Sequence, residues 1–396
     1  MRTTIRLRGP AEMITALPYH LGYRPTDSLV LVCLNGGQLG AVGRIDLPPP
    51  EVDPQLLVDE LMPLVREQQP DSAILIGYES QLRQSEAGSV ALRDALTDAG
   101  VEIVARLVVH GDRWWSLDCS GECCPAEGEP LPGEEQVPAI ADYIVLGRHP
   151  AQNRQELRDR LRGPVGPEQD ARCAVLMRDL ASARQHPRRL QRRQRRMFEH
   201  WARILGTIKE AAALDDEASS SGADPVPPPG DEAWAWAVVS LLDTSVRDLL
   251  IAWLCPGALE LEVFPVALRR LATTELPRPL RHSGNSTSRS SQGISSQGIS
   301  SQGIGSRDGV RAPAAWQEDI TAEEQLVERL AMVCRQAPPE LSPGPLTLFA
   351  HVVWWRGDGA LARTALDMAL EVDPRYKLAE ILGRMVDAAF RPGFSA

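Results

Sequence analysis

The chain has little of what would assign it to a familiar class. Lysine occurs only at Lys209 and Lys377, so 40 of its 42 basic residues are arginine (42 − 2). Together with the abundant alanine, proline and glycine, this bias indicates a GC-rich genome more than a mechanism. The formal net charge of −11 argues against a general polyanion binder, since the field of the whole protein repels polyanions. Any contact with nucleic acid would have to be local.

Long apolar runs are also missing. The N-terminus, MRTTIRLRGPAEM, lacks the apolar core of a secretory signal. The stretch from Ala233 to Leu254 is apolar but contains Asp243, Arg247 and Asp248, which a membrane span of about 20 residues rarely tolerates. Seven cysteines, an odd number in a long chain, fit a reducing compartment. We therefore expect a cytoplasmic protein without a membrane segment.

The common catalytic motifs are absent as well. The sequence contains no G-x-S-x-G elbow, no G-x-x-x-x-G-K-[ST] phosphate loop, no H-E-x-x-H and no G-x-G-x-x-G after a strand. This absence favours a non-enzymatic protein, in which the helical C-terminal part binds another protein.

Residues 1–150 show an alternation of predicted strands and helices. Apolar runs and turn residues predict a hairpin from Ser28 to Leu47, and a helix from Pro10 to Leu17 that Pro18 closes. A strand from Ser72 to Tyr78, a helix from Glu86 to Ala99 and a strand from Val101 to Val109 follow. The pattern predicts an α/β fold, a mixed-sheet sandwich whose sheet is partly parallel.

The rest of the chain reads as helical. We expect a helical region over residues 151–280 with one helix from Asp231 to Leu254, a disordered Ser/Gln/Gly linker over 281–311, and a helical segment over 312–396. In the last segment the spacing of Ala350, Ala362 and Ala369 resembles one tetratricopeptide repeat, a paired-helix unit. A length of 396 residues fits two folded units.

A cysteine cluster is the first candidate site. Four nitrogen or sulfur ligands for a zinc ion lie close together in the sequence: His110, Cys119, Cys123 and Cys124. Such an ion could activate water in a hydrolytic enzyme, and a reactive thiol is a second alternative. The spacing is not that of a C-x2-C pair, so buried, reduced cysteines that pack as small apolar side chains are the third alternative.

Polar residues around the predicted hairpin form a second candidate set, a ligand pocket made by Arg24, Asp27, Ser28, Arg44 and Asp46. Arg44 or Arg24 could instead face Asp27 or Asp46 in structural ion pairs, which are ordinary near strand ends.

An arginine-rich segment is the third. Residues 184–203 hold eight arginines and one glutamate, a local charge of +7. One guanidinium group can bind a phosphate through two hydrogen bonds. The candidates for binding nucleic-acid phosphates are therefore Arg188, Arg189, Arg192, Arg193, Arg195 and Arg196. These arginines are expected to wrap around more than one face of a helix, and Glu199 can pair with Arg195 or Arg203. A solvated face is the alternative.

Three stretches carry a family resemblance: PYHLGYRPTDSLVLV, GAVGRIDLP and WWSLDCSGECCPAEG, with ALARTALDMALEVDPRYKLAEIL near the C-terminus. Together they resemble the actinobacterial family called domain of unknown function 4192, while the arginine-rich segment and the repeated ISSQG tract look individual. The resemblance implies an actinobacterial, cytoplasmic protein with an α/β front and a helical back, and no activity. It marks as family-type positions Pro18, Gly22, Pro25, Ser28, Arg44, Asp46, Trp115, Cys119, Cys123, Cys124 and Pro125.

Overall fold

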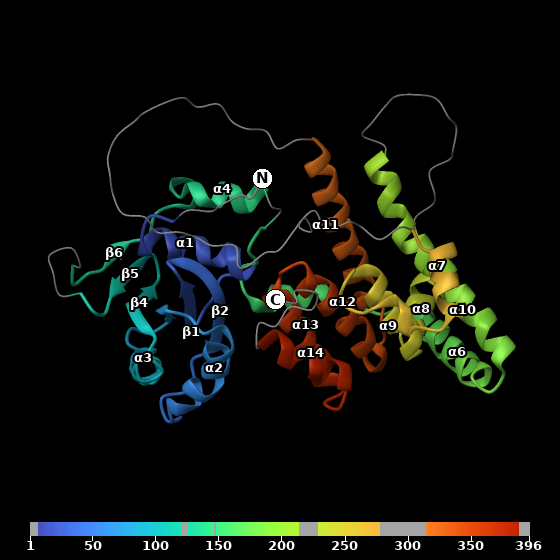
Figure 1. Cartoon of the computed structure of the whole chain (residues 1–396), viewed down its shortest axis with the longest axis horizontal. Helices are drawn as coiled ribbons and strands as arrows, with labels where there is room; N and C mark the ends of the chain where they lie inside the picture. Colours follow the sequence, from blue (N-terminus) through green and yellow to red (C-terminus); the bar gives the residue numbers. More distant parts are fainter. Residues whose placement is uncertain (1–6, 120–124, 146–147, 214–228, 278–313, 388–396) are drawn as a thin grey trace. The chain divides into compact units, whose positions relative to one another are not determined.

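The computed structural model describes residues 7–119, 125–145, 148–213, 229–277 and 314–387. These form two compact units, residues 7–154 and 155–386 (Figure 1). The first holds a six-stranded mixed sheet and the second is built of helices, so the predicted α/β class is confirmed. The linker expected over 281–311 lies outside the described residues.

The sheet of the first unit has the strand order β2-β1-β3-β4-β5-β6. Its strands are β1 (Ser28–Asn35), β2 (Gln38–Asp46), β3 (Ser72–Tyr78), β4 (Glu102–His110), β5 (Arg113–Ser116) and β6 (Glu129–Pro130). β1 and β2 form the predicted hairpin. β3 and β4 are parallel because helix α3 (Glu86–Asp98) carries the chain back between them, and the other pairs are antiparallel.

Helices cover both faces of this sheet (Figure 1). On one face, α3 and α2 (Gln55–Gln68) pack against alternate strand residues such as Leu31 and Leu75. On the other, α1 (Pro10–Leu21) contacts Tyr78, and the outer side of α1 packs against α4 (Pro138–Val145) through Tyr19 and Tyr143. The 3₁₀ turn η1 (Glu134–Gln136) precedes α4.

Helix α1 runs through the proline expected to close it. Pro18 has no N–H for the carbonyl of Ile14, which would otherwise lose its helical hydrogen bond. The Tyr78 hydroxyl donates to that carbonyl over 3.4 Å. A partner from the sheet thus replaces the missing donor, and the helix ends at Leu21, where Gly22 adopts a left-handed conformation (φ 79°). The predicted end at Leu17 was wrong.

The second unit is helical throughout its described part. Its elements are α5 (Arg154–Leu161), α6 (Pro167–Ala183), α7 (Pro187–Ala213), α8 (Asp231–Ser240), α9 (Thr244–Leu254), η2 (Leu261–Val263), α10 (Val266–Glu275), α11 (Ala314–Arg335), η3 (Pro339–Leu341), α12 (Pro343–Trp355), α13 (Gly359–Val372) and α14 (Lys377–Asp387). The single helix predicted from Asp231 to Leu254 is two helices. The Asp243 carboxylate accepts from the backbone N–H groups of Ser245 and Val246 and so begins α9.

Helix α12 lies in the middle of this unit's core. All of its side chains from Pro343 to Trp354 are buried. It packs against α13. Ala350 of α12 and Ala362 and Ala369 of α13 are fully buried, and their small side chains let the two helices approach each other. No described helix is long and apolar enough to cross a membrane.

Candidate functional site

One edge of the sheet gathers most of the polar candidates. Ser28 stands opposite both Asp46 and Tyr78, and Tyr78 stands opposite Val109. The start of β1 and the ends of β2, β3 and β4 therefore meet at one edge. Ligand sites of parallel sheets lie at the carboxyl ends of the strands, so this is where a pocket would be expected.

Arg44 is the centre of the contacts on the hairpin side. Its Nε donates to the Oγ of the fully buried Ser28 over 2.9 Å, and its guanidinium lies 2.5 Å from the Asp46 carboxylate. The guanidinium also lies 5.8 Å from the centre of the Tyr23 ring. Three predicted residues, Ser28, Arg44 and Asp46, are thus brought together.

The other two predicted residues turn to different partners. Arg24 forms an ion pair with Glu134, and that carboxylate also accepts from the Tyr19 hydroxyl over 2.5 Å. The hydrogen bond from Tyr19, with Arg24 adding to it, holds the pKa of Glu134 below its usual range. Asp27, in a left-handed conformation (φ 42°), accepts from the backbone N–H of Ser80 over 3.1 Å. Neither residue completes a pocket with Arg44.

Glu79 is the residue at this edge that the sequence interpretation missed. It directly follows β3 and is buried, and its carboxylate accepts from the backbone N–H of Arg83 (2.7 Å), the backbone N–H of Ser85 (2.7 Å) and the Ser85 hydroxyl (2.5 Å). These bonds hold the turn that leads into α3. A Cβ on Gly77 would lie 2.0 Å from the Ser85 Oγ, so the turn also requires glycine there. An acidic residue after a buried strand was the available signal.

His110 lies at the same edge, and its side chain also has a hydrogen-bond partner there. Its Nδ1 lies 3.0 Å from the carbonyl oxygen of Glu79. A carbonyl can only accept, so Nδ1 carries the proton. The polar groups of this edge therefore bond to one another, as the ion-pair alternative predicted for Arg44 and Asp46.

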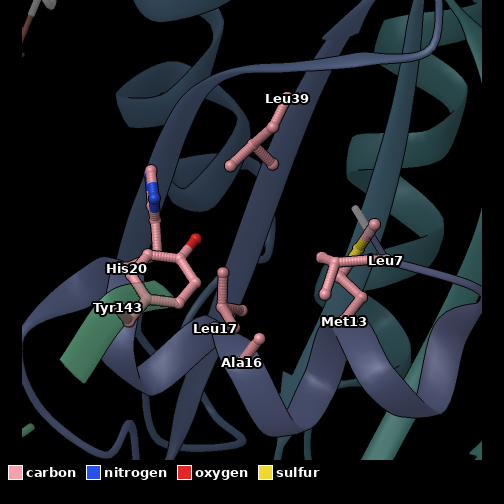
Figure 2. A pocket seen from close by; sticks show the side chains of 7 residues that line it. All are labelled: Leu7, Met13, Ala16, Leu17, His20, Leu39 and Tyr143. Atoms are coloured by element: carbon pink, nitrogen blue, oxygen red, sulfur yellow. The ribbon is translucent and has the colours of Figure 1, made fainter. Parts of the chain in front are cut away.

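A small pocket in the first unit is apolar and lies away from that edge. Figure 2 shows its lining residues, which come from α1, β2, α4 and the segment before α1: Leu7, Met13, Ala16, Leu17, His20, Leu39 and Tyr143. Its volume of about 10 Å³ is roughly what one water molecule needs. It is too small for a substrate.

Only part of the predicted zinc set can be placed. His110 and the half-buried Cys119 are described, whereas Cys123 and Cys124 lie outside the described residues. Within the described ranges, no group of three or more His, Cys, Asp or Glu side chains is arranged to hold a metal ion. The zinc site stays a prediction.

The arginines of α7 have a simpler arrangement than expected. Five of the six candidates are exposed and follow the helical spacing i, i+1, i+4, i+7, i+8, which confines them to about 120° of the helix circumference. We call this set the arginine stripe: Arg188, Arg189, Arg192, Arg195 and Arg196. The opposite side of α7 is buried in the core through Met197, Phe198 and Trp201. The sixth candidate, Arg193, turns inward to Asp179 and Trp236, so the six arginines occupy more than one face while the five exposed ones share one.

Most of the stripe lacks partners. Arg195 lies 3.8 Å from the Glu275 carboxylate of α10, and its side chain remains 59% exposed. Arg196 lies over the Trp236 ring, 5.4 Å from its centre. Arg188, Arg189 and Arg192 have neither a hydrogen bond nor an ion pair with any residue that the structure describes. As far as the described residues go, three guanidinium groups are therefore free to bind an anion.

The comparison with known families decides the relationship. The family model described as domain of unknown function (DUF4192) matches residues 10–294 and 303–393. The chain belongs to the DUF4192 family. The match extends beyond the stretches that carry the resemblance, and its range spans α7. No curated protein and no solved structure matches the chain.

Several DUF4192-type positions have clear roles in folding. Gly22 ends α1, and Arg44 links Ser28 to Asp46. Trp115 donates its indole N–H to the carbonyl of Ala126 over 3.1 Å, and its ring lies where a side chain on Gly128 would be. These positions stabilise the first unit and form no catalytic constellation among the described residues.

Proposed function

We propose that the arginine stripe of α7 binds the phosphate backbone of a nucleic acid. The observation that carries the proposal is the presence of five exposed guanidinium groups on one face of one helix, three of them without a partner among the described residues. Arginine keeps its charge at any physiological pH and binds phosphate oxygens through two parallel hydrogen bonds.

Two buried hydrogen bonds fix the position of α7 against its neighbours. Gln194 donates to the Asp243 carboxylate over 3.0 Å, and the Trp201 indole N–H donates to the Ser240 hydroxyl over 2.8 Å. Both bonds are buried and tie α7 to α8 and its junction with α9. The cost of ordering the site on binding is thus limited to the arginine side chains.

The net charge of −11 makes the interaction local and sensitive to salt. Each phosphate contact releases counterions, so five contacts predict a slope of log K against log salt of about −4.5. A solvated arginine face would show no such slope.

The test is fluorescence anisotropy of a labelled DNA duplex with the full chain, between about 50 and 200 mM salt. Replacing the three unpaired arginines (R188Q/R189Q/R192Q) is expected to reduce the slope by about 3 and to weaken binding at low salt at least about tenfold. The matched control, R66Q/R83Q/R375Q, changes the net charge equally at exposed arginines elsewhere and is expected to bind like the wild type. Unchanged affinity and slope in the first variant would eliminate the proposal.

Binding of a protein partner by the C-terminal helices is a second proposal with narrower support. Because α12 is buried all round, it offers no groove, and we place the contact on α13 and α14. Val372 and Ile381, exposed by 44% and 45%, are the apolar side chains available there. If V372S/I381S leaves all partners captured by the full chain unchanged, this proposal fails.

A further inference from the structure

We infer that the arginine stripe takes double-stranded nucleic acid in preference to single strands and contacts its backbone without reading base sequence. This inference rests on the proposed function and names the substrate class of the same site. Three properties of the described part of the second unit carry it: the burial of α7, the absence of exposed Phe, Tyr or Trp rings beside the stripe, and the length of the stripe.

The first property is the burial of α7 among its neighbours. The helix packs against α6, α8, α10 and α11. After Pro187, all of its described side chains that are exposed lie on the stripe side. A recognition helix with its side chains is about 10–12 Å wide and nearly fills a major groove about 12 Å wide, so its flanks must be free. The flanks of α7 are occupied. The stripe therefore reaches phosphates at the groove edge and leaves the base edges unread.

The second property concerns aromatic side chains. Proteins that bind single strands combine a cationic groove with rings on which successive bases stack, a contribution of about 1–3 kcal/mol per base. Under the stripe, Phe198, Trp201 and Trp236 are at most 2% exposed. Among the described residues of α6 to α10, no Phe, Tyr or Trp side chain is exposed, and the one exposed imidazole there is that of His186. A single strand would find charge there but no row of rings on which successive bases could stack.

Trp236 has a different task. Its ring is covered by the guanidinium groups of Arg193 and Arg196, 5.3 and 5.4 Å from its centre, and by the stacked ring of His200. The indole thus holds Arg196 in place at the end of the stripe. A base cannot replace these groups without breaking the packing of α7 on α8.

The third property is the length of the stripe. From Arg188 to Arg196 it extends about 12 Å along the helix axis. A duplex presents one phosphate charge per about 1.7 Å of its axis, hence about seven over this length, whereas one strand presents half as many. Over this length a duplex offers a phosphate to each of the five arginines, whereas one strand offers only about three or four phosphates.

The experiment compares three labelled probes with the full chain at about 50 mM salt: two DNA duplexes of about 20 base pairs with unrelated sequences, and a thymidine single strand of the same length. We expect the two duplexes to bind within about twofold of each other and the single strand about tenfold more weakly. In R188Q/R189Q/R192Q the duplex affinity is expected to fall to that of the single strand, and in R66Q/R83Q/R375Q to remain.

The outcomes separate the two proposals. Equal or tighter binding of the single strand, or a tenfold difference between the duplexes, overturns the inference but leaves nucleic-acid binding standing. If none of the three probes binds, or if R188Q/R189Q/R192Q binds all of them like the wild type, the proposed function itself fails and the inference fails with it.

Discussion

Arginine has two opposite uses in this molecule. In the first unit, Arg44 and Arg106 have side chains only 12% and 11% exposed, and each is held by a carboxylate, Asp46 and Asp118 respectively. In the second unit, Arg188, Arg189 and Arg192 are exposed and have no partner that the structure describes. A buried guanidinium must be paired because its desolvation is costly, whereas an exposed one remains available. The lack of a described partner is shared by isolated exposed arginines such as Arg66 and Arg83, so it is the clustering on one helix face that marks the α7 arginines as candidate binding residues.

A second contrast separates buried polar side chains that are hydrogen-bonded from those that are not. Glu79 and Ser28 are buried and engaged by hydrogen bonds. The indole N–H of Trp114 in the first unit, and in the second unit both imidazole nitrogens of His351 and Nδ1 of His200, are buried without a hydrogen-bond partner among the described residues. An unpaired buried polar group lowers stability. The predictions below test this contrast, beginning with the largest effect.

Removing the Glu79 carboxylate should destabilise the turn between β3 and α3. Glu79→Ala leaves the N–H groups of Arg83 and Ser85 and the Ser85 hydroxyl without their acceptor. Each buried donor left unpaired costs about 1–3 kcal/mol, so we expect a loss of about 4 kcal/mol in the free energy of unfolding of the first unit. Urea unfolding followed by circular dichroism measures it, and the exposed Glu67→Ala is the control. A loss no larger than that of the control would mean that the turn does not depend on Glu79.

His351 should make the second unit sensitive to acid. Burial lowers its pKa to about 4 from an ordinary value of 6.5, so as the pH falls the unfolded chain takes up the proton first. Stability is therefore complete above pH 6.5 and declines as the pH falls from 6.5 toward 4, by about 3 kcal/mol in total.

The check is hydrogen exchange of α12 in that pH range. His351→Leu is expected to flatten the decline, while the exposed His186→Gln is expected to keep it. Parallel curves for the wild type and His351→Leu would show that other groups cause the acid sensitivity.

The fold was largely predictable from the sequence because apolar periodicity and turn residues decide it. The hairpin at Asn35-Gly36-Gly37 and the strand before and after α3 follow from local patterns. The errors at Pro18 and Asp243 have different causes. At Pro18 the deciding partner is distant in the sequence, because the Tyr78 hydroxyl from the sheet replaces the missing donor. At Asp243 the partner is local, because the side chain caps the backbone N–H groups that begin α9.

The candidate sites were less predictable, because a sequence gives residue types and not partners. Arg24 finds Glu134, far away in the chain, and Asp27 finds the backbone of Ser80. Periodicity alone could have revealed the arginine stripe, since positions 188, 189, 192, 195 and 196 share one helical face. That Glu275 rather than Glu199 approaches Arg195 depends on the packing of α10 and could not be read from the sequence.

Breaking the Arg44 contacts should cost less than losing Glu79. Arg44→Leu removes the bond to Ser28 and the ion pair with Asp46, but the Asp46 side chain is 69% exposed and water can solvate it. We expect a loss of about 1 kcal/mol in the free energy of unfolding of the first unit. Arg44→Lys should recover part of it, because lysine keeps the charge but loses the planar contact with Tyr23. If both variants are as stable as the wild type, the pairing of Arg44 does not contribute to the stability of the first unit.

The smallest effect is expected where the proposed binding site lies. R188Q/R189Q/R192Q removes no described contact and relieves the mutual repulsion of five neighbouring cations. The free energy of unfolding of the second unit, measured by thermal unfolding, should therefore change by less than about 0.5 kcal/mol. Arg193→Gln is the contrasting variant. It removes the ion pair with Asp179 and the contact with Trp236, and should destabilise the unit by about 1 kcal/mol or more. Equal destabilisation by the two variants would make the stripe a structural element, and its exposure would no longer argue for a ligand.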